Sequence, residues 1–398
     1  PMGILRIILA VAAINSVAPA AFSAEKPASH FTVDYDATAQ SFRQLCDFIV
    51  AEKADFRTIF IGGYYMRTLV AGSRILEDHR YLDTAIAYAD SLLTRQSPRG
   101  YWGTGYGNVY LADTGSALGL FIVLHKHVSS ERKQKYREAV GRFVNAIEKD
   151  GLIFPSGAFG VGYKAKSNGE ITGPFLEEYT ISSALAGGEI FTWYARHGGE
   201  MRHNETAYRA LRWVISTMRE DGVIPYILPA IGADRAKAGT PKADAALWED
   251  YKYQVATYLG EGIVSFDRHA RNPAQTREIR AAIQPHIEFL LRSQNPEGTW
   301  AKKDSADQKR SPGVTNLLIW YYLNVEKDER ITEAVKRFNR VLTDPAAAKE
   351  FGMLNRGAGT NWKTPANKVG KFVPNDILTA LSGRAMADML SPGIDSEW

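Results

Sequence analysis

Apolar residues recur at helical spacing from residue 38 to residue 390. Positions i, i+3 and i+4 are apolar in successive stretches, which predicts amphipathic helices. Strand-like alternation is scarce, and its main exception, residues 223–227, contains a proline that limits it to a short extended piece. The pattern therefore predicts an all-α protein. The predicted helices cover residues 41–52, 59–76, 81–94, 113–125, 131–148, 174–196, 205–219, 248–269, 276–292, 313–324, 329–342 and 376–389.

The predicted helices differ in the width of their apolar face. Helices 131–148 and 329–342 carry charged residues along one face, whereas helices 113–125, 174–196 and 313–324 are apolar nearly all round. A helix that is apolar on every side is buried. We therefore expect an inner ring of helices inside an outer ring, which is a toroid of helical hairpins. About six hairpins fit, an (α/α)6 toroid, and one missed short pair would make it (α/α)7.

One turn between helices occurs twice. Residues 92–102 read LLTRQSPRGYW, and residues 290–300 read LLRSQNPEGTW. In both copies a helix ends, a Pro/Gly turn follows, and a tryptophan precedes the next helix. The glycine suits the left-handed position that ends a helix. Internal repeats on this scale are typical of stacked supersecondary units.

The amino-terminal residues predict export. Arg6 precedes the short apolar run 7–13, and Ala21-Phe22-Ser23 fits the small-x-small rule of a cleavage site. The run is too short to remain as a membrane helix. We therefore expect residues 1–23 to be a signal peptide and residues 24–398 to form one catalytic domain. The mature protein would be periplasmic or secreted in a bacterium and not attached to a membrane.

Composition narrows the function classes. The chain has a formal net charge of +4 and one cysteine, Cys46, so a disulfide framework and a Cys-rich zinc site are excluded. The histidines form no His-x-x-x-His pair, so we predict no metal and no cofactor. The chain has no dense Lys/Arg tract, so we do not predict nucleic-acid binding. The mild positive charge permits an acidic substrate, and we expect a monomer.

The Gln-x-Pro-x-Gly-x-Trp turns and the alternating helices resemble the α/α-toroid carbohydrate enzymes, namely toroidal polysaccharide lyases and six-hairpin glycosidases. The size and single-domain form resemble most the lyases that act on alginate or glucuronan. This resemblance implies a groove for an acidic polysaccharide. The Asn-Asn-His motif of one alginate lyase family is absent. Terpene cyclases have a similar toroid and similar turns, but the chain lacks an Asp-rich motif.

In such a toroid the loops that enter the inner helices border the groove, which makes the stretch before the fourth predicted helix a candidate site. Its glycines allow close approach of a ligand, and its aromatic faces can stack on sugar rings. Asp113 can cap the following helix or contact the sugar. The expected substrate contacts here are Trp102, Tyr106, Asn108, Tyr110 and Asp113.

A second candidate stretch starts the helix predicted at residues 174–196. A proline in a first turn followed by acidic residues is ordinary helix-start chemistry. Glu178 and Tyr179 would lie on different faces, so at least one of them is expected to point into the groove as a substrate contact.

The densest group of candidates is Trp248-Glu249-Asp250-Tyr251-Lys252-Tyr253. Successive helical residues rotate by about 100°, so Glu249, Lys252 and Tyr253 can share one face. The plain alternative is a solvated helix start with an ion pair three residues apart. Trp248 would contact substrate. The basic loop from Lys302 ends at Arg310, which could hold a uronate carboxylate with two hydrogen bonds.

These residues suit β-elimination on a uronic-acid polymer. Tyr251 or Tyr253 would act as base and acid if nearby cations such as Lys252 lower the tyrosine pKa. Arg310 would neutralise the carboxylate of the sugar, and Glu249 would be the orienting or proton-sharing partner in the site.

Two alternatives stay open at this point. An inverting glycoside hydrolase would need two carboxyls from the set Asp113, Glu178, Glu249 and Asp250. A non-catalytic glycan-binding toroid would use the same aromatic loops.

Overall fold

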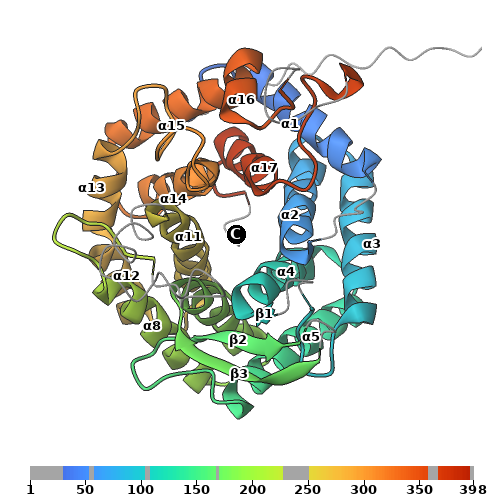
Figure 1. Cartoon of the computed structure of the whole chain (residues 1–398), viewed down its shortest axis with the longest axis vertical. Coiled ribbons are helices and arrows are strands. Elements are labelled where there is room, and N and C mark those ends of the chain that lie inside the picture. Colours follow the sequence, from blue (N-terminus) through green and yellow to red (C-terminus); the bar gives the residue numbers. More distant parts are fainter. Residues whose placement is uncertain are drawn as a thin grey trace, which may run out of the picture.

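Six inner helices form a closed ring in the computed structural model, which describes residues 30–52, 58–103, 108–166, 170–226, 251–356 and 366–394 (Figure 1). Each inner helix packs on the next, and the last packs on the first. The third inner helix is continuous through α6, η2 and α7. The inner helices are α2 (Ile59–Ile75), α4 (Leu111–Leu124), α6 (Thr180–Ser182) with η2 (Ser183–Phe191) and α7 (Thr192–His197), α11 (Lys252–His269), α14 (Ser311–Asn324) and α17 (Ile377–Leu390).

An outer helix precedes each inner helix along the chain. The described residues therefore contain six hairpins, which confirms the (α/α)6 alternative of the predicted toroid. The outer helices are α1 (Tyr35–Ala51), α3 (His79–Arg95), α5 (Ser130–Lys149), α8 (Met201–Ser216), α12 (Pro273–Ala282) with α13 (Gln284–Arg292), and α15 (Glu329–Thr343) with α16 (Pro345–Phe351). Short 3-10 turns are η1 (His125–His127), η4 (Gln308–Arg310) and η5 (Ala366–Lys368).

The width of the apolar face decides which ring a helix joins. In α4 every residue except Asp113 is buried. The outer helix α15 instead buries a single stripe and leaves its charged residues in solvent. Burial of the apolar surface drives both arrangements, so the predicted distinction between inner and outer helices is confirmed.

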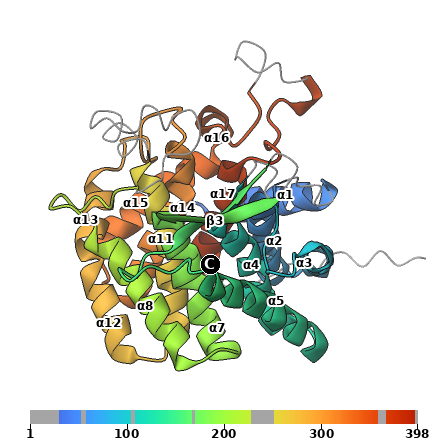
Figure 2. The same cartoon turned by 60° about the horizontal axis from the view of Figure 1, so that its bottom comes forward.

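A three-stranded antiparallel sheet lies over one end of the ring (Figure 2). It consists of β1 (Asn108–Tyr110), β2 (Gly160–Ala165) and β3 (Ile171–Glu178), in that order. The predicted helix 174–196 is therefore wrong at its start. Pro174 lies in β3, an edge strand, where the missing N–H of proline costs little. The strands escaped prediction because most of β2 is buried without alternation and β3 buries only one residue fully.

Two other helix predictions differ from the structure. The predicted helix 276–292 is divided at Ile283 into α12 and α13, because Pro285 in the first turn of α13 cannot donate a helical hydrogen bond. The short helix α16 was not predicted, although Asp344 and Pro345 form an ordinary helix start. Both differences concern the outer ring and leave the inner ring unchanged.

The repeated turns have the same structure in both copies. The Gln96 side-chain amide donates to the carbonyls of Gly100 (2.9 Å) and Ala139 (3.0 Å). The Gln294 amide likewise donates to the carbonyls of Gly298 and Ala334, both at 2.8 Å. Each glutamine thus ties its own turn to the next outer helix. The motif is a packing device of the toroid.

The structure corrects the expectation that Trp102 contacts a sugar. Trp102 is 3% exposed, and its indole N–H donates to the carbonyl of Leu92 at 2.9 Å. Trp300 in the second copy is fully buried and donates to the carbonyl of Leu290 at 2.8 Å. A buried indole with its N–H satisfied has no free face for a ligand.

Gly100→Ala is expected to destabilise the fold much more than Gly151→Ala. Both glycines have positive φ, at 80° and 67°, so an alanine costs about 1–2 kcal/mol of backbone strain at either place. A Cβ on Gly100 would lie 2.3 Å from the Phe143 backbone nitrogen, whereas nothing lies within 4 Å at Gly151. This overlap should add about 1–3 kcal/mol. Equal midpoints of the two variants in urea unfolding would contradict the packing role of this turn.

The predicted signal peptide, residues 1–23, lies outside the described residues. Export and a periplasmic or secreted location therefore stay predictions. In the described part of the chain, no helix combines the length and the apolar character needed to cross a membrane.

Candidate active site

One end of the ring carries the long connections. The described parts of the connections from outer to inner helices lie there, whereas the connections back to the outer ring are short turns at the other end (Figure 2). The amino-terminal ends of the inner helices therefore face this mouth. Of the predicted site residues at these ends, four lie close to one another, namely Asp113, Tyr179, Tyr251 and Arg310. The structure brings the four together at the ring axis, and the contacts below define the site.

Tyrosines form one wall of the site. The hydroxyl groups of Tyr179 and Tyr226 are 2.9 Å apart, and the rings of Tyr226 and Tyr251 have centroids 5.3 Å apart. The Gln254 side-chain amide donates to the Tyr226 hydroxyl at 3.3 Å. Tyr226 was not predicted as a site residue, although it lies within the extended piece expected at residues 223–227.

Arg310 faces this wall with unused hydrogen-bond donors. Its Nη2 donates to Gln254 Oε1 at 3.4 Å, and its guanidinium carbon lies 5.4 Å from the centroid of the Tyr258 ring. The Nε and Nη1 atoms of Arg310 are buried and have no hydrogen-bond partner among the described residues. Buried donors are rarely left unpaired. These two donors lie on different edges of the planar guanidinium, and each of them can bind a carboxylate oxygen.

Asp113 lies in the first turn of α4 and is partly exposed to solvent. Protein atoms nevertheless surround its carboxyl, and this burial raises the pKa of Asp113 to about 7, while Arg310 lowers it less. Arg310 is the one charged group of the described residues that shifts this pKa. The alternative role of Asp113 as a helix cap is wrong, because α4 begins at Leu111 and Tyr110 occupies the cap position. Its carboxyl therefore has no cap role and is available to a ligand at the mouth.

The buried tyrosines around Arg310 have raised pKa values. Burial raises the pKa of Tyr179 and of Tyr226 above the usual range, and raises that of Tyr258 to about 12. Arg310 lowers the pKa values of Tyr226 and Tyr258, but by less than burial raises them. These hydroxyls stay protonated near neutral pH and can donate protons or hydrogen bonds.

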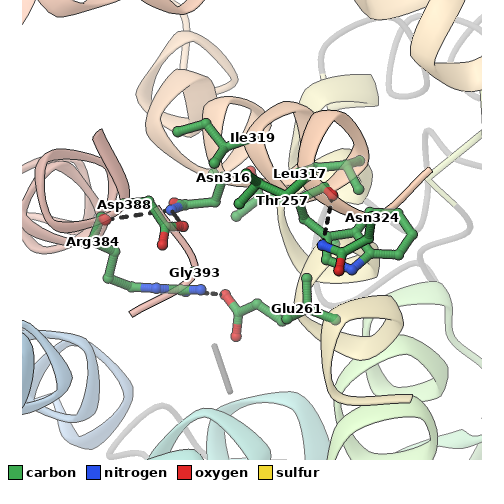
Figure 3. A pocket seen from close by; sticks show the side chains of 14 residues that line it. Thr257, Glu261, Asn316, Leu317, Ile319, Asn324, Arg384, Asp388 and Gly393 are labelled. Atoms are coloured by element: carbon green, nitrogen blue, oxygen red, sulfur yellow. Dashed lines mark hydrogen bonds and ion pairs between the residues drawn. The ribbon is translucent and has the colours of Figure 1, made fainter. Parts of the chain in front are cut away.

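A buried charged network closes the ring axis beneath the site. Glu261 accepts hydrogen bonds from Tyr64, Arg67 and Arg384, and Arg67 also donates to Glu189 at 3.0 Å. Figure 3 shows Arg384 and Glu261 pointing toward one another across the axis. The Arg67 guanidinium fits there because Gly119 has no side chain: a Cβ would lie 1.0 Å from its Nη2.

Below this network is a narrow pocket with about 20 Å³ of free volume, which is room for one water molecule. Asn316 and Asp388 line it and are joined by a hydrogen bond of 2.5 Å (Figure 3). Gly393, after the end of α17, lines the same pocket. The volume is too small for a sugar, so ligands are expected to enter from the mouth that carries Asp113.

Several predicted site residues lie elsewhere. Tyr253 is 3% exposed and stacks on Phe289 of the outer helix α13 at 5.7 Å, so it points away from the axis. The Lys252 ammonium lies over the Tyr253 ring at 5.7 Å, on the same side. The structure therefore corrects the assignment of both residues to the catalytic centre. It does place them on one face, as the helical spacing predicted.

Glu178, Asn108 and Tyr110 also differ from the expected arrangement. Glu178 lies in β3, and its carboxylate accepts from Ser156 at 2.6 Å. Ser156 belongs to a turn that packs on the outer helix α8 through Gly157. Asn108 contacts Ala165 N within the sheet at 3.4 Å, and Tyr110 is half-buried at the cap position of α4. Tyr106, Trp248 and Glu249 lie outside the described residues.

Sequence reasoning missed the polar residues of the inner helices. Gln254, Tyr258 and Glu261 occupy one face of α11 at spacings of four and three residues. Glu189 and Glu261 are acids in the middle of inner helices, each among apolar neighbours, and Arg67 and Arg384 are arginines in similar positions. Buried charges require partners. That mismatch was a signal that could have paired them before the structure was known.

The arrangement gives no support for a metal centre. In the described ranges, no group of three or more His, Cys, Asp and Glu side chains is placed to hold a metal ion. The site instead combines a guanidinium, one carboxyl with a pKa near neutrality and several protonated tyrosines. This set can bind an anion and transfer protons next to it.

No protein-family model matches the sequence. No curated protein matches it either. Solved structures do match its fold. A polysaccharide lyase superposes with a TM-score of 0.59 at 11% identity, covering 89% of this chain and 97% of the lyase.

An inactive variant of an α-1,6-mannanase of Salegentibacter, in complex with α-1,6-mannotriose, gives a TM-score of 0.57 at 12% identity, covering 90% and 99% of the two chains. A type II terpene cyclase from Scytonema, in complex with its substrate, superposes with a TM-score of 0.55 at 13% identity, covering 89% of this chain and 98% of the cyclase. Identities this low establish the fold alone. The chain thus has the α/α-toroid fold found in polysaccharide lyases and six-hairpin glycosidases.

Proposed function

We propose that this protein is a glycan-processing enzyme that cleaves a uronate-containing polysaccharide of the alginate or glucuronan type by β-elimination. The observation that carries the proposal is the pair formed by Arg310 and Asp113. Arg310 has two buried donors without partners, and Asp113 opposite has its pKa raised to about 7 by burial. The same toroid occurs in a polysaccharide lyase and in a mannanase that binds mannotriose.

In the proposed reaction Arg310 binds the carboxylate of the sugar through its guanidinium, which has buried donors without partners. Neutralising this carboxylate stabilises the negative charge that develops when the neighbouring carbon loses its proton. Asp113 in its ionised form takes this proton, since a pKa near neutrality suits a general base.

A tyrosine at the mouth donates the other proton that the reaction needs. The bond from carbon 4 to the glycosidic oxygen breaks, a double bond forms between carbons 4 and 5, and the tyrosine hydroxyl protonates the leaving oxygen. Tyr251 fits this step best, because it is half-buried at the rim, whereas the Tyr179 and Tyr226 hydroxyls are engaged with each other. Asp113 therefore replaces tyrosine as the base expected from the sequence.

Glycoside hydrolysis is the second candidate, and the raised pKa of Asp113 favours it as well. A carboxyl with this pKa can serve as the general acid of a glycosidase. Hydrolysis also requires a second carboxyl across the scissile bond. Among the described residues, Arg310 is the charged group that shifts the pKa of Asp113, and no carboxylate shifts it. Glu249 and Asp250 lie outside them.

The deciding experiment is incubation of the purified protein with alginate, glucuronan and neutral glycans. Ultraviolet absorbance of the unsaturated product together with new reducing ends is the expected result on a uronate polymer. New reducing ends without this absorbance would replace elimination by hydrolysis. Binding without either signal would leave a non-catalytic glycan-binding toroid.

Arg310→Ala is expected to lower kcat/KM on the uronate polymer by about 100-fold, the usual loss when a group that stabilises developing charge is removed. Arg310→Lys should recover only part of this, because an ammonium cannot form two parallel bonds to a carboxylate. Arg330→Ala serves as the control, since Arg330 forms exposed ion pairs on the outer helix α15. If Arg310→Ala kept wild-type kinetics, Arg310 would have no role in binding the carboxylate.

A further inference from the structure

A second cleft opens beside the site, on the outer side of the start of α11. Its free volume is about 350 Å³, and its walls are Lys252, Tyr253, Asn295, Ala301, Lys302, Ser305 and Asp307. We call it the lysine cleft. It contains Lys252 and Tyr253, the residues that the sequence pattern singled out and that the structure places away from Asp113.

We propose that the lysine cleft binds a second acidic sugar of the same polysaccharide molecule. The substrate is then a polyanion with acid groups on other sugars besides the one at which it is cleaved. This inference rests on the proposed function. It adds a second binding place, outside the Arg310 site, for another uronate of the polymer.

Two ammonium groups make the cleft cationic. The Lys252 Nζ lies 5.7 Å from the ring centroid of Tyr253 and 5.9 Å from that of Phe289, so the two ring faces hold it in place. Lys302 is exposed, and its ammonium forms no ion pair with a described residue. An acidic sugar entering the cleft meets both charges.

The carboxylate in the wall does not cancel this charge. Asp307 is 1% exposed, and its two oxygens accept the backbone N–H groups of Tyr253 and Gln254 at 2.8 and 2.7 Å. The start of helix α11 thus compensates the negative charge of Asp307, because backbone N–H groups and the helix dipole favour an anion there. The cleft keeps the positive charge of its lysines.

The loop that carries Lys302 is held in one conformation. Ala301 has a φ of 66°, a value that costs a non-glycine residue strain energy. The Asn295 side chain fixes this conformation, since its Nδ2 donates to the Ala301 carbonyl at 2.6 Å. Lys302 follows directly, so its backbone is positioned at the cleft before a ligand arrives.

A short turn connects the lysine cleft to the site. Asp307 borders the cleft and directly precedes the turn η4, which ends at Arg310. At about 2 Å per residue of 3-10 helix, the two positions are about 6 Å apart along this turn. Gln254, held by Asp307, also contacts Arg310. One polymer can therefore contact Arg310 and the lysine cleft with units close together in its chain.

The test compares Lys302→Glu with Lys303→Ala. Lys303 is the next residue, but its ammonium pairs with Glu350 outside the cleft, so it serves as the control position. Substrates are uronate oligosaccharides of two lengths, a short one that fills only the Arg310 site and a long one that reaches further. Removal of one exposed charge pair changes affinity by up to about fivefold. Charge reversal should double the effect in free energy, which raises this upper limit to about 25-fold. We expect Lys302→Glu to raise KM for the long oligosaccharide about tenfold, to leave the short one unchanged, and to make binding less sensitive to salt.

Binding of the same oligosaccharides by calorimetry separates this inference from the proposed function. Turnover with equal KM values for Lys302→Glu and Lys303→Ala would overturn the lysine cleft alone. A different result is also possible: the wild type binds the long oligosaccharide without turnover, and Lys302→Glu weakens this binding. That result would support the lysine cleft and overturn the proposed function. No binding of either oligosaccharide to the wild type would overturn both.

Discussion

Asp113→Asn is expected to lower kcat/KM on a uronate polymer by about 10²- to 10⁴-fold, the usual contribution of a positioned proton-transfer group. Asparagine keeps the size of the side chain and cannot take a proton. Substrate binding should persist, since Arg310 keeps its two donors. Kinetics together with calorimetry on the inactive variant measure both quantities.

The pH profile of the wild type distinguishes the two chemistries. Burial raises the pKa of Asp113 to about 7. If Asp113 is the base of an elimination, kcat/KM rises as the pH increases through about 7, because the ionised form is active. If Asp113 is the acid of a hydrolysis, kcat/KM falls over the same range. In Asp113→Asn, the change of kcat/KM with pH near 7 should be absent.

Stability provides the control for Asp113→Asn. The folded-state pKa of Asp113 is raised above its unfolded value, so ionisation of this group weakens the fold as the pH rises through that interval. The neutral asparagine should therefore be at least as stable as the wild type above neutral pH. Asp304→Asn, at an exposed position with a φ of 60°, should keep full activity. Wild-type turnover by Asp113→Asn would remove Asp113 from the mechanism.

Glu261→Ala is expected to destabilise the protein by about 3–5 kcal/mol, because it removes one partner from a buried ion pair and leaves charge without compensation. Glu261 receives hydrogen bonds from Arg67, Arg384 and Tyr64 and is 2% exposed. Without it, Glu189 is the carboxylate that remains beside the Arg67 guanidinium. Urea unfolding followed by circular dichroism measures the loss.

The matched control is Glu131→Ala. Glu131 pairs with Lys135 on the exposed face of α5, four residues apart. Such a pair contributes about 0.2–0.5 kcal/mol, so this variant should unfold almost like the wild type. Equal stability of Glu261→Ala and Glu131→Ala would show that the network at the ring axis does not hold the inner helices together.

The two large effects belong to two layers of the same axis. Asp113, Arg310 and the tyrosines form the upper layer at the mouth, and Glu261 with its arginines forms the lower layer. Tyr258 connects the layers, since both Asp113 and Glu261 raise its pKa. A ring of apolar helices leaves polar groups only where they face its axis, so binding and stability depend on neighbouring side chains. A loss of folding in Glu261→Ala should therefore be measured before its activity is interpreted.

The sequence by itself determined the helical class, the two rings and the mouth of the toroid. These follow from local periodicity, because a helix buried on all sides carries apolar residues all round. Asp113, Tyr179, Tyr251 and Arg310 could be selected because each begins or precedes an inner helix. That position places a residue at the mouth wherever the helix lies in the ring.

Only the tertiary structure decided what depends on contacts between distant parts of the chain. Residues 171–178 form a strand because β2 offers them partners, which helix propensity cannot reveal. Lys252 and Tyr253 turn outward because Phe289 of α13 lies beside them. Arg67 and Arg384 find Glu261 at separations of 194 and 123 residues. The pKa of Asp113 likewise depends on burial by other helices, which no local pattern encodes.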